Sequence, residues 1–228
     1  MGTSSARRPP STRLWRLARG AATRYLAPEA PAPAFAGEVV ARYLTALREG
    51  SGQEAGALAS FRQTRKVSQE LGAFAALAQS QGWAGALTAR GLQDLAGQPP
   101  EVLAPALAAA LSGPGADLEA AAARAALTSI LMEEAAAPDP ARWVARFLAG
   151  ALYSRLALDL GESLEAAAPA CRPFRAGAAG LRTVIEASAQ TLPPAPPPAP
   201  EHWQGLAGWL WVTSILEGLL RRLSQFKK

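Results

Sequence analysis

The chain has 228 residues, with 23 Lys and Arg against 18 Asp and Glu, and it contains one cysteine and one histidine. Its length is that of one domain with room for a small appended segment. The single cysteine, Cys171, excludes an intrachain disulfide, and thiolate zinc or iron–sulfur centres would lack ligands. The single histidine, His202, excludes paired-histidine metal motifs and weakens the case for an ordinary hydrolase. We expect a protein of the reducing cytoplasm.

The net charge of +5 resides at the N-terminal end of the chain. Six arginines precede the first acidic residue, Glu29, and without them 17 Lys and Arg remain against 18 Asp and Glu. A nucleic-acid-binding domain usually spreads its cations over a folded face. The charge is therefore the property of a basic arm attached to a nearly neutral body.

Residues 1–10, MGTSSARRPP, are small, polar and basic, and they cannot bury enough surface to offset the entropy of ordering. We predict that this arm is flexible. No apolar run of signal-peptide length follows it, so export is not expected. Ala6 stands where myristoylation requires Ser or Thr, whereas Gly2 is small enough for removal of Met1. Such removal would leave a free glycine amine at the end of the arm.

A short basic amphipathic helix is predicted to begin at Ser11 and to end before Pro28. Apolar residues recur there every three to four positions, with arginines on the other side: Leu14, Leu17, Ala18, Ala21 and Tyr25. The first interpretation is that Leu14 and Leu17 pack on the body and the arginines stay solvated. Docking on a partner protein is the second interpretation, and contact with membrane or nucleic acid is the third.

The body is predicted to be helical almost throughout, because alanine is abundant, β-branched residues are sparse and strand-type alternation is missing. Gly- and Pro-rich breaks delimit the expected helices. The first of these helices ends at Gly50. The others are expected at 54–80, 83–95, 101–111 with a bend at Pro105, 117–134 with Asp117 as cap, 143–161 and 171–190. The helix over 143–161 is the most apolar, and we expect it to run through the centre of the bundle.

The chain changes character at residues 191–200, which contain six prolines and predict a polyproline II spacer. The last predicted helix, 201–226, is apolar nearly all round, but its uncharged centre is shorter than the ~20 residues that cross a bilayer. Core packing is favoured for this helix over an interface, and the interface interpretation rests on Trp203, Trp209 and Trp211.

The sequence therefore predicts an all-α fold, an irregular multi-helix bundle in four segments. These are a basic arm with its short helix at 1–35, a helical bundle at 36–190, a Pro-rich linker at 191–200 and a Trp/Leu-rich helix at 201–228. No catalytic residue and no metal site is predicted, because carboxylate pairs such as Glu133 and Glu134 lack a histidine and Cys171 lacks a second reactive group nearby.

Four stretches in order, MGTSS at the start and residues 92–103, 111–134 and 147–167, resemble the QatB family. This family is the small helical component of the four-gene Qat anti-phage defence system of bacteria, and the resemblance covers roughly residues 1–190. Family members often continue with a Gly/Pro-rich stretch after MGTS, whereas this chain goes directly to Ala6, Arg7 and Arg8.

The resemblance implies a defence component that is not itself an enzyme. It implies three partners, namely an ATPase (QatA), an enzyme similar to the queuosine-pathway synthase QueC (QatC) and, as a further candidate, a TatD-like nuclease (QatD). Enzymes of the QatC type use ATP to act on a 7-deazaguanine carboxylate, and their defence relatives are understood to join such a base to an N-terminal glycine amine. The resemblance thus predicts no intrinsic cofactor, but a covalent 7-deazaguanine adduct at Gly2, with Thr3, Ser4, Arg7 and Arg8 binding the partner.

Two alternatives remain open at this point. In the first, the chain is a purely structural adaptor whose bundle and C-terminal helix dock on the ATPase, and the arm serves only as a tether. In the second, the arm binds nucleic acid, and its affinity falls steeply with salt.

Overall fold

The computed structural model describes residues 12–26, 33–50, 56–133, 139–168, 170–192 and 196–226. Within these ranges the fold consists of eight α-helices and three short 3-10 helices, with no strand. The predicted all-α fold is confirmed.

The first two helices, α1 (Arg13–Leu26) and α2 (Pro33–Gly50), pack against each other. The predicted helix before Pro28 is therefore present, but its buried face differs from the expected one. Leu17 is exposed, whereas Trp15 is buried and lies edge-on to Tyr43 of α2, with 5.8 Å between ring centroids. The expectation that Leu17 packs on the body is wrong, whereas Leu14 is partly buried against the core as expected.

The middle of the chain forms η1 (Ala57–Phe61), α3 (Arg62–Ala89), η2 (Gln93–Leu95), α4 (Pro100–Ser112) and α5 (Leu118–Glu133). Two helices predicted on either side of Gly82 are one kinked helix, α3. Gly82 has φ 75° and ψ 169°, a conformation that only glycine adopts without strain, so the axis bends there while the helix resumes. Asp117 caps α5 as predicted, since its Oδ1 accepts a hydrogen bond of 2.8 Å from the Ala120 N–H.

The C-terminal part forms α6 (Pro140–Ala167), α7 (Cys171–Gln190), η3 (Pro200–His202) and α8 (Leu206–Ser224). The predicted end of α6 near Gly161 is wrong, because the helix continues for another turn and buries Leu164. The last helix starts later than predicted, because a 3-10 turn and Gly205 precede Leu206. Residues 196–199 carry no helix, and 193–195 of the predicted spacer lie outside the described residues.

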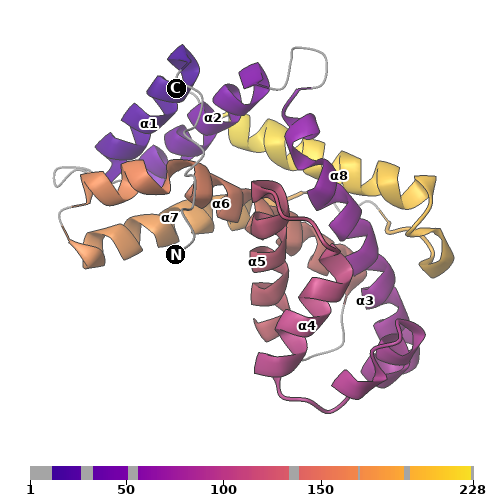
Figure 1. The fold of residues 1–228 in the computed structure, drawn as a ribbon. Helices are drawn as coiled ribbons and strands as arrows, with labels where there is room; N and C mark the ends of the chain where they lie inside the picture. Colours follow the sequence, from indigo (N-terminus) through magenta and orange to yellow (C-terminus); the bar gives the residue numbers. More distant parts are fainter. Residues whose placement is uncertain are drawn as a thin grey trace.

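Two hydrophobic clusters form the core, and α6 contributes to both. Val144, Leu148 and Leu152 pack in a cluster with α1, α2, α7 and α8, whereas Trp143 and Phe147 pack with α3, α4 and α5. Figure 1 shows this arrangement: α1, α2 and α7 lie around one end of α6, α4 and α5 lie at the other, and α8 crosses beside α3. The predicted central place of this helix is confirmed.

The described helices were compared with the requirements of a membrane span. None of them combines the length and the apolar character that crossing a bilayer would require.

Candidate partner-binding surface

Thr12 is the first residue that the structure describes. Its hydroxyl donates a hydrogen bond of 2.5 Å to Glu49 Oε2 near the end of α2. The arm residues singled out above, Gly2, Thr3, Ser4, Arg7 and Arg8, lie outside the described residues. The start of α1 is therefore tied to α2.

The helix that follows, α1, lies on the body with its buried face, as the first interpretation of this segment expected. Trp15, Ala18 and Ala22 are buried in the first hydrophobic cluster, and Arg13, Arg16 and Arg24 are exposed. Arg24 lies 3.6 Å from Glu38 of α2, which also accepts a hydrogen bond of 2.7 Å from Arg42.

Of the three tryptophans predicted to bind a partner, Trp203 is fully buried. Its ring lies edge-on to Trp211 with 5.2 Å between ring centroids, and its indole N–H has no hydrogen-bond partner among the described residues. Gln69 of α3 donates from Nε2 to the carbonyl oxygens of Trp203 (2.9 Å) and Gly205 (3.0 Å). Trp203 thus serves packing, and the turn before α8 is fastened to α3.

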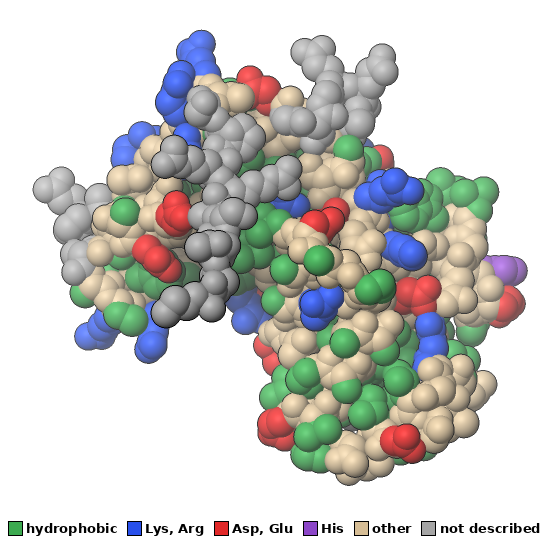
Figure 2. All heavy atoms as spheres, in the orientation of Figure 1, with side chains coloured by type: hydrophobic (Ala, Val, Ile, Leu, Met, Phe, Trp, Pro, Cys, Tyr) green, Lys and Arg blue, Asp and Glu red, His purple; other side chains and the backbone are tan. Residues whose placement is uncertain are grey.

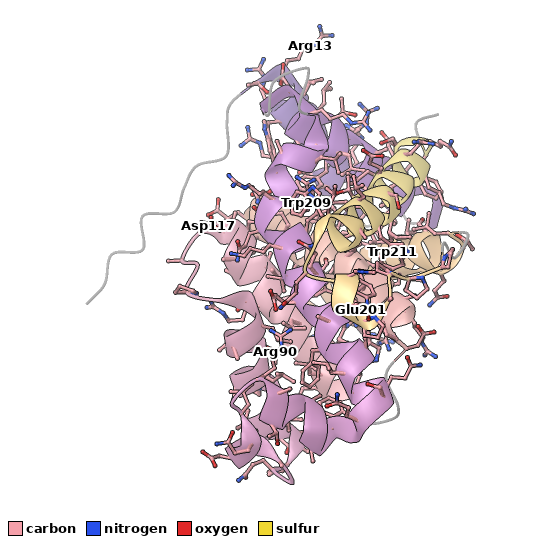
Figure 3. All side chains as sticks on the ribbon, turned by 90° about the vertical axis from the view of Figure 1, so that its right-hand side faces the viewer. Arg13, Arg90, Asp117, Glu201, Trp209 and Trp211 are labelled. Carbon is pink, nitrogen blue, oxygen red and sulfur yellow. The ribbon has the colours of Figure 1, made fainter. Side chains whose placement is uncertain are left out.

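Trp211 and Trp209 point to different sides of α8 (Figure 3). Trp211 is 8% exposed and lies at a cleft of about 590 Å³ that α6, α7 and α8 line together. Trp209 is partly exposed, and the guanidinium carbon of Arg65 lies 4.2 Å from its ring centroid, a cation–π contact. Arg65 Nη1 also donates to Thr213 Oγ1 at 3.2 Å. Among the three tryptophans, Trp209 is the one whose ring reaches the surface beside α3.

Two leucines on the outer face of α8 complete an apolar surface beside Trp209. Leu206 is 72% exposed and Leu210 is 58% exposed, the largest fractions among the large apolar side chains that the structure describes. We define the α3–α8 patch as Leu206, Trp209 and Leu210 of α8 together with Arg62, Arg65 and Lys66 of α3. Figure 2 shows hydrophobic side chains gathered over the end of α8 next to Lys and Arg side chains of α3.

The electrostatics of the patch are dominated by its cations. Burial lowers the pKa of Arg65, and the charge of Arg62 lowers it further, while Glu119 and Glu217 act in the opposite direction. Arg62 and Lys66 are exposed and lie one helical turn apart on α3. The apolar side chains of α8 form a ridge, and the cations of α3 lie along one edge of it. This arrangement is suited to binding a partner and not to catalysis.

The predicted absence of a metal site concerns the acidic residues, the cysteine and the histidine. The described residues contain no group of three or more His, Cys, Asp or Glu side chains that could hold a metal ion. Cys171 is exposed at the first residue of α7, and His202 is exposed in η3.

A family model described as "Qat anti-phage system associated protein QatB" matches residues 52–190, more than half of the chain. The chain belongs to the QatB family. No match was found among curated proteins or among solved structures. As a QatB family member it is an associated protein of an anti-phage system, and the other components of that system are its expected partners. The matched range runs from η1 to the end of α7, so it contains the α3 half of the patch and leaves α8 outside.

The sequence pointed only in part to this surface. Leu206 and Leu210 stand in a helix that is apolar nearly all round, so their pattern could not tell the outer face from the inner one. The three tryptophans were predicted to bind a partner because of their large apolar side chains, but Trp203 and Trp211 are buried. The one available signal was the cluster of Arg62, Arg65 and Lys66, whose neighbour across the fold is α8.

Proposed function

We propose that this QatB family member is a non-enzymatic adaptor of the Qat system and also a protein substrate, which presents the amine of Gly2 to the QueC-like enzyme of that system. The observation that carries the proposal is a basic arm beginning Met1-Gly2, ahead of a body that belongs to the QatB family.

The proposed reaction forms one amide bond. ATP on the enzyme would first convert the carboxylate into a mixed anhydride with a phosphoryl or adenylyl group. The nitrogen of Gly2 would then attack the acyl carbon, the acyl C–O bond would break, the departing phosphate or AMP would carry that oxygen away, and the amine would lose a proton to solvent. A glycine amine suits this attack because no side chain crowds it and because its pKa of about 7.7–8.0 leaves part of it neutral at pH 7.

The length of the arm limits where the enzyme must bind. Once Met1 is removed, ten residues, 2–11, precede Thr12, and a fully extended chain of that length spans at most about 36 Å. Arg7 and Arg8 would attract an acidic or nucleotide-containing channel, each contributing ~1 kcal/mol if exposed. Thr3 and Ser4 would supply hydroxyl donors close to the reacting amine.

Intact-mass spectrometry of the chain co-expressed with the other Qat components tests this proposal. We expect loss of Met1 and a mass increase that maps to the N-terminal peptide. Gly2→Pro should abolish both the added mass and defence, whereas the control Ser5→Ala should keep them. An unmodified N terminus in a defending cell, or full defence by Gly2→Pro, would contradict the substrate role.

A purely structural adaptor is the second candidate, and the exposed Leu206 and Leu210 favour it. In that case, deletion of residues 1–10 leaves defence intact, whereas Trp209→Ala abolishes assembly with the ATPase. Trp209 is the suitable position, because Trp211 is buried and its removal would also damage the fold.

A further inference from the structure

The α3–α8 patch presents an apolar ridge, formed by Leu206 and Leu210, that no described residue covers. Leu206 and Leu210 are four residues apart and therefore share one face of α8, while Trp211, Ile215 and Leu219 of the same helix are buried. Single exposed apolar side chains are common on monomers. Two exposed leucines one helical turn apart, beside the partly exposed Trp209, are the kind of apolar group that marks a protein-binding site.

This ridge is held rigidly against α3. Gln69 fastens the turn before α8 through two carbonyl oxygens, and Arg65 fastens the helix itself through the Trp209 ring and Thr213. A surface that is ordered before binding loses little further entropy when a partner arrives. The leucines and the cations of α3 therefore form one preorganised unit.

The cations along the edge are not neutralised within the described part of the chain. There, no carboxylate lies within ion-pair distance of Arg62 or Lys66. The nearby carboxylates are engaged elsewhere: Glu119 accepts from the Thr64 N–H (2.7 Å), and Glu70 pairs with Arg90 and accepts from Gln204 (2.9 Å).

Glu217 is the one carboxylate on the exposed face of α8 whose charge acts on Arg65. Together with Glu119, which also acts on Arg65, it sets two carboxylates against the three cations of α3 among the described residues. The uncompensated charge beside the ridge selects partners that carry acidic side chains next to apolar ones.

We propose that the α3–α8 patch binds an acidic amphipathic helix of another component of the same Qat system. The spacing of Leu206 and Leu210 matches apolar side chains that recur every third or fourth residue of a partner helix, and Arg62 and Lys66 pair with Asp or Glu flanking them. A second copy of this chain fits less well, because a two-fold contact would bring the same three cations together from each side. The proposal rests on the adaptor part of the proposed function.

The test compares two patch variants with two controls in the full chain, co-expressed with the other Qat components. Leu206→Ser/Leu210→Ser removes the ridge, and Arg62→Glu/Lys66→Glu reverses the charge. Val102→Ser/Leu158→Ser changes two leucine-sized or smaller apolar residues that are also about half exposed, and Arg172→Glu/Arg175→Glu reverses two exposed cations on α7. Thermal unfolding verifies that each variant is folded.

The readouts are the Qat component that co-purifies and its dissociation constant. We expect both patch variants to bind at least about tenfold more weakly, which corresponds to about 1.4 kcal/mol, and both controls to bind like the wild type. Binding of the wild type should weaken between about 50 mM and about 200 mM salt, because exposed charges are screened.

Three results would overturn the proposal. If both patch variants bind as tightly as the wild type, the patch is not the binding surface. If Leu206→Ser/Leu210→Ser weakens binding but Arg62→Glu/Lys66→Glu does not, the partner is not acidic. A dimer in light scattering that Leu206→Ser/Leu210→Ser dissolves shows that a second copy covers the patch. A wild-type chain that captures no Qat component contradicts the adaptor function itself. The N-terminal mass, measured on the same samples, reports separately on the Gly2 proposal.

Discussion

The hydroxyl of Tyr43 on α2 donates a hydrogen bond of 2.7 Å to Asp159 Oδ2 on α6, 116 residues further along the chain. The same carboxylate oxygen accepts from Arg155 Nε at 2.9 Å, so a buried tyrosine and a largely buried ion pair join the two helices. Burial raises the pKa of Tyr43 well above its ordinary value, and the charge of Asp159 adds to that effect. The contact is polar and yet lies at the edge of the hydrophobic core.

Tyr43→Phe should lower the free energy of unfolding by about 1.5–3 kcal/mol, because Asp159 loses a donor in a site with little water. Urea denaturation measures this. Tyr153→Phe is the matched control, since the Tyr153 hydroxyl makes no hydrogen bond to the residues that the structure describes. Equal stability of the two variants would mean that the Tyr43 bond contributes nothing.

A pH dependence is expected from Glu119, whose Oε1 accepts the Thr64 N–H at the start of α3. Burial raises the pKa of Glu119, although the Thr64 bond and the charge of Arg155 act against that rise. The folded state therefore binds this proton more tightly than the unfolded state. The resulting stability is complete below the unfolded pKa of about 4.3 and is lost as the pH rises through the folded pKa.

Glu119→Gln cannot titrate, so its stability relative to the wild type should increase as the pH rises from about 4 to about 7. Urea denaturation at a series of pH values measures the difference. Glu119→Ala leaves the Thr64 N–H without this acceptor and should be less stable than Glu119→Gln at every pH. A difference between wild type and Glu119→Gln that does not change with pH contradicts the prediction.

Gly72 allows the buried ring of Trp203 to approach α3. A methyl group at Gly72 would collide with ring atoms of Trp203, which has no free space in which to move. We expect Gly72→Ala to cost about 1–3 kcal/mol in thermal or urea unfolding. Gly161→Ala is the control, because nothing lies within 4 Å of the added methyl group there, and a gain of about 0.4–1 kcal/mol is expected. A gain of stability in both variants would show that helix propensity, and not the Trp203 contact, decides the effect.

The two tryptophans of α8 should separate folding from binding. Trp211→Ala should lower stability by about 3–5 kcal/mol, because it leaves a cavity beside Trp203. Trp209→Ala mainly removes the contact with Arg65, and about 1 kcal/mol is expected. Denaturation curves of both variants, recorded beside the binding assay, check this. A similar loss for both would place Trp209 in the core.

The ends of helices were predictable where a chemical stop signal was present. Cys171–Gln190 agrees with the expected range, and Asp117 caps α5. Glycine was a poorer guide, because Gly82 bends a helix that resumes and Gly161 lies inside α6. Both glycines have neighbours that favour helix, and the packing of those neighbours outweighs the small penalty of one glycine.

The candidate surface was less predictable than the fold. Whether Leu17 or Trp15 faces inward depends on the ring of Tyr43, and whether Leu206 faces outward depends on how α3 meets α8. These are contacts between segments far apart in the chain, so a helical period identifies an apolar residue without naming its neighbour. The contact of Arg65 with Trp209, separated by more than half of the chain, is of the same kind.

The shared helix α6 has a consequence for how the molecule melts. Val144 and Leu148 belong to one hydrophobic cluster, and Trp143 and Phe147 belong to the other, on neighbouring positions of the same helix. If one hydrophobic cluster unfolded, part of α6 would lose its packing contacts, and the second cluster would lose the side chains that α6 contributes to it. The two clusters should therefore unfold together. Scanning calorimetry should show a single peak whose calorimetric enthalpy equals the van't Hoff enthalpy. Heat would then expose α8 and its leucines only when the whole chain unfolds, which keeps the docking surface intact up to the melting temperature.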